Sequence, residues 1–243
     1  MNRRIILNSF KADIKFIARD PTLLLAFLAQ FMLILFLRLV FPLLSDIILL
    51  KTAFRLISYY TIVAITMVAI IPMLFGMVYA FIFLDENNTH ILQPISGTLA
   101  GKKNLLYMKM VVSLFLSFIM VLLTVILTNP VSTEGWLRTI YISFLLAIQS
   151  PFAFLFIGGL AGNKIEGLAL SKLYGIILIT VPLGLLLHHP WNYLMFFSPL
   201  YWISWAWVTS VPSESLLYGG LSIVLTSGGI LIFFRHFLKK HAS

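Results

Sequence analysis

The sequence predicts an all-α integral membrane protein that crosses the bilayer with about six helices. The 243 residues are 60% hydrophobic and only 10% charged, whereas soluble domains carry about 25% charged residues. The mean hydropathy of +1.02 also indicates a lipid-embedded chain. Because the apolar runs use most of the sequence, we expect residues 1–243 to form one transmembrane domain. Each run approaches the roughly 20 residues that a membrane-spanning helix needs, and the runs lie near 21–44, 56–84, 110–128, 137–160, 173–188 and 215–235.

Basic residues are distributed unevenly over the segments between these runs. Of the 17 Lys and Arg residues, Lys51, Arg55 and Arg138 fall on one side and Arg38 lies within a span. The positive-inside rule makes the other side cytoplasmic, so both termini are expected in the cytoplasm of a multi-pass protein of the cell membrane. The net charge of +9 therefore reflects topology and does not indicate nucleic-acid binding. The remaining basic residues are Arg3, Arg4, Lys11, Lys15, Arg19, Lys102, Lys103, Lys109, Lys164, Lys172, Arg235, Lys239 and Lys240.

The residue pattern argues against chemistry performed by this chain alone. There is no cysteine, which excludes disulfides and thiolate metal sites. The segment Gly97–Lys103 has three residues between its glycines and a Lys after Lys102, whereas a phosphate loop needs four residues and a Ser or Thr. His188-His189 has no nearby carboxylate. We expect no catalytic residue, no metal site and no cofactor bound by this chain.

The first 20 residues predict an amphipathic helix that lies at the membrane surface. At 100° per residue, Ile6, Phe10, Ile14 and Ile17 share one face. Lysines on the opposite side would meet anionic headgroups. Asp20-Pro21 then has the residue types of a helix cap and a first helical residue, which starts the first span. The basic positions of this helix are Arg4, Lys11, Lys15 and Arg19.

Two polar residues interrupt the first span. Gln30 and Arg38 are candidates for a role between helices or along a transport pathway. A cation deep in the bilayer costs about 2.5–3.5 kcal/mol on insertion scales. Arg38 lies toward the outer third of the run, so snorkelling to the headgroups is an equal alternative.

Small residues predict where helices pack closely. Gly76 and Ala80 lie four positions apart in the second span, and Gly158 and Gly162 repeat this spacing at the end of the fourth. Such spacing lets backbones approach each other and favours a packing role. The charged segment 163–172 that follows is expected on the cytoplasmic side, where it forms a second candidate docking surface.

An aromatic segment, 188–213, precedes the last span and is broken by Pro190, Pro199 and Pro212. With Trp136, its four tryptophans place all five indoles of the chain on the outer side. Indoles favour the headgroup level, so we expect a re-entrant or interfacial segment. An outer gate is the alternative.

The polar segment 85–108 and its flanks carry an ordered pattern of short motifs: Leu84-Asp85-Glu86, Ile91-Leu92-Gln93, Thr98-Leu99, Lys102-Lys103 and Tyr107-Met108-Lys109. This pattern resembles the first cytoplasmic loop of type-2 ABC exporter permeases. Two departures are Leu99, where the family usually has proline, and Thr89-His90, which replaces an acidic residue and glycine. The resemblance extends along nearly the whole chain, through the N-terminal helix, Arg38 with Pro42, and the aromatic outer segment.

The resemblance implies a permease that works with a separate ATPase subunit, which would bind ATP and Mg²⁺. It also implies a second permease copy, identical or different. By the same resemblance, residues 1–20 correspond to an elbow helix and residues 85–108 to a coupling loop. The implied ATPase contacts are Asp85, Glu86, Gln93, Lys102, Lys103, Lys164 and Glu166. The implied membrane-interface positions of the elbow are Phe10, Lys11, Lys15 and Arg19.

The cargo is open at this point. Family members near this pattern export drugs or antimicrobial and amphipathic peptides, and the apolar composition suits hydrophobic or amphipathic cargo. The resemblance places the path between the first, second and fifth helices of two copies. The alternatives are a permease of the same fold for lipid-linked glycans and a non-transporting membrane sensor or immunity subunit.

Overall fold

The computed structural model describes residues 13, 15, 17–88, 99–128, 135–187 and 190–242, without the side chains of 87, 88, 99–103, 105 and 238–242. Every regular element within these residues is helical, and six helices are long and apolar enough to cross a membrane. The predicted fold class is confirmed, while the orientation in the membrane stays a prediction. The six spans are Pro21–Thr52, Leu56–Glu86, Leu106–Thr128, Trp136–Leu160, Lys164–Leu186 and Pro212–Phe237.

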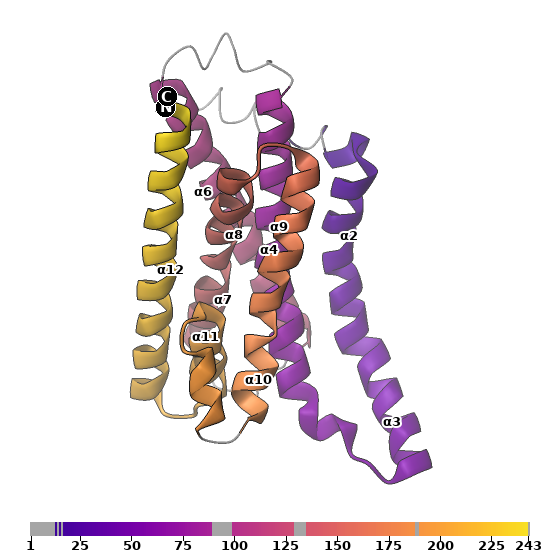
Figure 1. Cartoon of the computed structure of the whole chain (residues 1–243). Helices are drawn as coiled ribbons and strands as arrows, with labels where there is room; N and C mark the ends of the chain where they lie inside the picture. Colours follow the sequence, from indigo (N-terminus) through magenta and orange to yellow (C-terminus); the bar gives the residue numbers. More distant parts are fainter. Residues whose placement is uncertain are drawn as a thin grey trace.

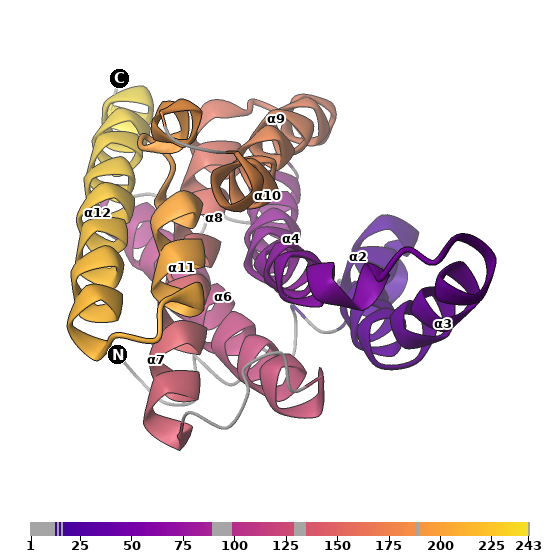
Figure 2. The same ribbon diagram turned by 90° about the horizontal axis from the view of Figure 1, so that it is seen from below.

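The first span consists of α2 (Pro21–Leu35), a π-helical turn η1 (Phe36–Val40) and α3 (Phe41–Thr52). The wide turn precedes Pro42, which has no N–H to donate to the previous turn. The expected end near residue 44 was wrong, because the helix continues through Asp46 to a left-handed residue at Ala53. As a result, α3 extends beyond the rest of the bundle, and α2 and α3 stand at its edge (Figures 1 and 2).

The core is built by the second and fourth spans. The second span comprises the 3-10 turn η2 (Leu56–Tyr59) and most of α4 (Tyr60–Asn88), and the fourth comprises α7 (Trp136–Ala147) and α8 (Gln149–Leu160). A Cβ added at Gly76 would lie 2.6 Å from the Cβ of Ala153, and one at Gly158 would lie 3.6 Å from the Cβ of Ala80. The predicted packing role is therefore confirmed for Gly76, Ala80 and Gly158 between α4 and α8, whereas Gly162 lies beside Glu166.

Three spans cover this core. They are α6 (Leu99–Thr128), α9 (Lys164–Leu178) with α10 (Thr180–Leu186), and α12 (Pro212–Ala242). The fifth span begins at Lys164 and not near residue 173, because Asn163 caps the helix through the backbone N–H of Glu166. Most of the hydrophobic residues on α12 face outward, where a membrane would meet them.

The aromatic segment before α12 forms the 3-10 turn η3 (Trp191–Met195) and α11 (Pro199–Val208). Helix α11 packs against α12 and contributes Trp207, with 3% of its surface exposed, to the core. Trp136 and Trp191 are 71% and 65% exposed, as headgroup-level indoles would be. The tryptophans therefore divide between a packing role and an exposed one, and His188-His189 lies outside the described residues.

Candidate functional site

Helix α4 ends, and α6 and α9 begin, at the top of the bundle in Figure 1, which we call the upper end. The ion pairs between described side chains lie at this end. Asp85 and Glu86 are consecutive residues at the end of α4, and each pairs with a lysine from a different helix. Two ion-pair clusters result, and we name them after Lys164 and Lys109.

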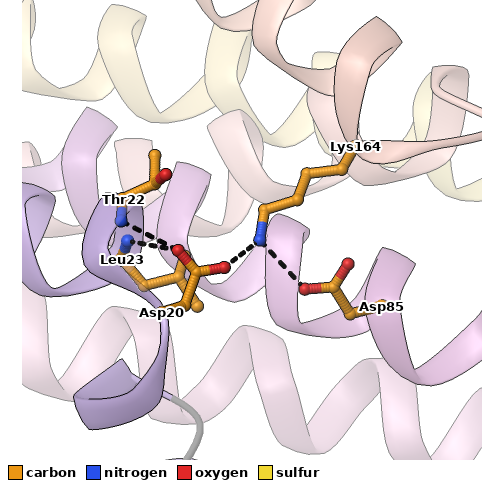
Figure 3. A network of polar contacts seen from close by, with 5 residues as sticks. All are labelled: Asp20, Thr22, Leu23, Asp85 and Lys164. Atoms are coloured by element: carbon orange, nitrogen blue, oxygen red, sulfur yellow. Dashed lines mark hydrogen bonds and ion pairs between the residues drawn. The ribbon is translucent and has the colours of Figure 1, made fainter.

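The Lys164 cluster joins three helices (Figure 3). Lys164 is the first residue of α9, and its ammonium group pairs with Asp20 before α2 and, at 3.1 Å, with Asp85. Asp20 also caps α2, because its Oδ1 accepts from the backbone N–H groups of Thr22 at 2.8 Å and Leu23 at 3.3 Å. The three charged side chains are 23–29% exposed, so water reaches this cluster.

The Lys109 cluster joins α4, α6 and the segment that precedes α2. The ammonium group of Lys109, on α6, pairs with Oδ1 of Asp13 and, at 2.9 Å, with Oε1 of Glu86. The Lys109 and Asp13 side chains are 0% and 2% exposed, and Glu86 is 15% exposed. The second oxygens of both carboxylates are buried and accept no hydrogen bond in the described structure.

The pKa of Asp13 in the Lys109 cluster and the pKa of Asp20 in the Lys164 cluster are shifted in opposite directions. Burial raises the pKa of Asp13, and the charge and hydrogen bond of Lys109 do not offset it. Burial also acts to raise the pKa of Asp20, but hydrogen bonds from Lys164 and two backbone N–H groups outweigh it and lower the pKa. The cause of the difference is the deeper burial of Asp13 and the larger number of donors on Asp20.

Comparison with known proteins identifies the kind of protein that carries these clusters. The model of the family described as "Fluoroquinolones export permease protein Rv2686c-like" matches residues 13–234. The chain belongs to this family of export permeases. Two curated relatives named fluoroquinolones export permease, from the CDC 1551 / Oshkosh and ATCC 25618 / H37Rv strains of Mycobacterium tuberculosis, are each 26% identical over 243 positions. The alignments cover 95% of this chain and 92% of each relative.

The recognition of an export permease from sequence is thus confirmed, and the permease is a transmembrane transport protein with six apolar spans among its described residues. The match to the family model begins at Asp13 and so includes every charged residue of both clusters. No solved structure matches the chain significantly.

The structure brings only some of the predicted contact residues of this permease together. Asp85, Glu86 and Lys164 meet in the clusters. Glu166 instead caps α9, because its carboxylate accepts from the backbone N–H of Gly162 at 2.7 Å and from the side chain of Asn163 at 3.0 Å. Lys15 and Arg19 are exposed. Of the others, Phe10, Lys11 and Gln93 lie outside the described residues, and Lys102 and Lys103 lie on α6 with undescribed side chains.

Sequence reasoning missed Asp13, Asp20 and Lys109 as members of the site. Lys109 stood at the end of the polar loop pattern, but nothing in its neighbourhood indicated complete burial. Asp85 and Glu86 were predicted only as ATPase contacts, and the sequence did not reveal that both acids have basic partners within the chain.

The two polar residues of the first span differ in environment. Gln30 is fully buried on the face of α2 that also carries Leu23, Ala26 and Ile34, and neither of its amide atoms has a described partner. Arg38 is exposed within the π-helical turn. Their roles along a pathway or between helices stay predictions. In the described part of the chain, no group of three or more His, Asp or Glu residues could hold a metal ion.

Proposed function

We propose that the permease is the transmembrane half of an ATP-driven exporter and that a separate ATPase subunit, which binds ATP and Mg²⁺, docks at the upper end. Two permease copies, identical or different, would complete the transporter. The permease would contribute the passage and the response to ATP, while hydrolysis takes place in its partner. The proposed side of docking is cytoplasmic, because the positive-inside rule assigns that side to the segments with most of the Lys and Arg residues.

The observation that carries this proposal is the position of Asp85 and Glu86. They lie in the last turn of α4 (Tyr60–Asn88), the helix at the centre of the bundle. Through Lys164 and Lys109 they connect that end to α2, α6, α9 and the segment of Asp13. A partner that shifts the end of α4 would therefore act on most of the bundle at once, which is what coupling to ATP binding requires.

The paired acids change which groups would face the ATPase. Asp85 and Glu86 are engaged inside the chain, so their proposed role is to transmit a displacement in addition to any direct contact. The first turn of α9 offers exposed groups beside them, namely Ile165, with 83% of its surface exposed, and Glu166. We propose that this turn and the loop 85–108 form the docking surface.

For cargo we propose a small amphipathic drug, with a fluoroquinolone as the first compound to test. The support is the name of the two relatives and their similarity along almost the full length of the chain. Export of antimicrobial or amphipathic peptides is the next candidate. The alternatives of lipid-linked glycan cargo and of a sensor or immunity subunit have no comparable support from the relatives.

The test is purification of the tagged permease from its native membrane in mild detergent, followed by ATPase assay and fluoroquinolone uptake into inverted vesicles. We expect a stoichiometric ATPase subunit and ATP-dependent uptake. The double variant Asp85→Asn/Glu86→Gln should keep the ATPase bound but lose most drug-dependent transport. The matched control is Asp46→Asn, an exposed acid on α3 at the opposite end.

Two results would contradict the proposal. A permease that is purified alone from well-expressing native membranes would argue for a sensor or immunity subunit. Full transport in the double variant would mean that the end of α4 does not couple ATP hydrolysis to export.

A further inference from the structure

The Lys109 cluster contains more acid than base in a place that water hardly reaches. Two carboxylates, from Asp13 and Glu86, face one ammonium group, and the Lys109 side chain has no exposed surface. With every group ionised, the cluster carries one uncompensated negative charge. The unpartnered oxygens, Oδ2 of Asp13 and Oε2 of Glu86, leave that charge without further hydrogen-bond donors in the described structure.

An uncompensated buried charge is costly, and proteins commonly remove it by binding a proton. When two carboxylates share a site, they cannot both ionise easily, so one of them keeps a proton to higher pH. A metal ion is a poor substitute here, because the ammonium group of Lys109 already lies between the two acids and would repel it.

Among the described side chains, no neighbouring group supplies the missing positive charge. On α4, Asp85 adds a further negative charge near Glu86. Tyr79 lies close enough to Asp13 for an electrostatic interaction, but its phenol group carries no positive charge. Lys164, on α9, pairs with Asp85 and Asp20 instead. On the segment before α2, the described basic residues Lys15 and Arg19 are exposed to solvent.

We propose that Asp13, Lys109 and Glu86 form a proton-binding site in which the two carboxylates share one proton, and that this proton holds the segment of Asp13 against α4 and α6. The proposal goes beyond export driven by an ATPase and does not depend on it. The proton would be taken up from the side of the membrane on which the upper end lies.

The sign of the effect follows from linkage. Burial in the docked state raises the pKa of Asp13 above its value when the segment is released. The protonated form therefore favours docking. Docking is strongest at low pH. It weakens as the pH rises through the raised pKa, because the carboxylate pair then loses its shared proton. Because the two carboxylates interact, this loss is a property of the pair and not of one residue.

The test is an infrared pH titration of the purified permease, which detects the carbonyl band of a protonated carboxyl group directly. In the wild type we expect such a band at pH 7, well above the ordinary carboxyl pKa of about 4, and its loss at higher pH. Glu86→Gln leaves one acid for one lysine, so the band should be absent at pH 7. Asp13→Asn should act in the same way, while Asp46→Asn should keep the band.

A second measurement follows the docking itself. The natural chain has no cysteine, so spin labels can be placed at Lys15→Cys and at Val111→Cys, an exposed residue of α6. The distance between the labels should increase as the pH rises in the wild-type background. In the Glu86→Gln background it should stay short at all pH values.

Three results would overturn the proposal. These are a wild-type protein without the carboxyl band at pH 7, a band that persists in both Glu86→Gln and Asp13→Asn, and a label distance that does not depend on pH. None of these readouts requires an ATPase or a cargo, so they fail or succeed independently of the proposed export function.

Discussion

The Lys109 and Lys164 clusters have the same composition, one lysine between two acids, yet they differ in their contact with water. Each uses one of the two consecutive acids in the last turn of α4. The side chains of the Lys164 cluster are 23–29% exposed, whereas Lys109 and Asp13 are almost completely buried. The contrast teaches that solvent, more than the number of charges, decides whether such a cluster keeps its acids ionised.

The largest expected effect separates the two lysines. Lys109→Met should destabilise the fold by about 3–5 kcal/mol, because it leaves two buried acids without a partner. Lys164→Met should cost about 1 kcal/mol or less, because water screens its acids. Thermal unfolding in detergent would measure both. Equal losses would show that burial does not distinguish the clusters.

The two adjacent acids should respond to neutralisation with opposite signs. Glu86→Gln removes the excess charge of the Lys109 cluster and should stabilise the permease by about 1 kcal/mol at pH 8, because a buried uncompensated charge is costly. Asp85→Asn removes one partner of Lys164 and should destabilise by less than about 1 kcal/mol. The same unfolding assay at pH 8 measures the pair, and a loss of stability in Glu86→Gln would refute the excess-charge argument.

The pH dependence of stability should also differ between Asp13 and Asp20. Asp20 has a lowered pKa, so its contribution is present above its ordinary value of 3.8 and disappears as the pH falls through the lowered one. Asp13 has a raised pKa, so its contribution disappears as the pH rises through the raised value. The unfolding profile of Asp20→Asn should therefore lack the loss of stability at low pH. The profile of Asp13→Asn should lack the loss of stability at higher pH. Identical profiles for the two variants would contradict this assignment.

The smallest expected effect is that of salt. The Debye length falls from about 10 Å at 0.1 M to about 3 Å at 1 M, and screening acts mainly on exposed charges. Added salt should therefore reduce the stability difference between wild type and Lys164→Met by a few tenths of a kcal/mol. The stability difference between wild type and Lys109→Met should not change. A salt response of equal size in both variants would place the Lys109 cluster in contact with solvent.

Hydropathy was enough to predict the six spans, because roughly 20 apolar residues in a row have few alternatives to a membrane helix. It placed the first and fifth spans wrongly where polar residues continue a helix, as Asp46 does in α3 and Glu166 in α9. The site was only half predictable. Asp85 and Glu86 stood out by charge and position, but Lys109 meets Asp13 across 96 residues and Lys164 meets Asp20 across 144.

The tryptophans illustrate the same limit. Their clustering before α12 predicted an interfacial segment. The sequence around a tryptophan at the headgroup level does not differ from that around a buried tryptophan. Only the packing of α11 against α12 distinguishes Trp207 from Trp191. Contacts between distant segments decide burial, and a single sequence does not reveal them.

The π-helical turn and Pro42 lie in a span that is longer than a bilayer is thick. At 1.5 Å per residue the 32 residues from Pro21 to Thr52 measure about 48 Å, against about 30 Å of hydrocarbon. Hydrophobic mismatch of this size is relieved by tilting, by bending, or by leaving one end outside the hydrocarbon. Arg38 lies about 26 Å along the helix from Pro21, close to the opposite headgroups. An arginine that sequence places inside a membrane span would then sit beside lipid phosphates.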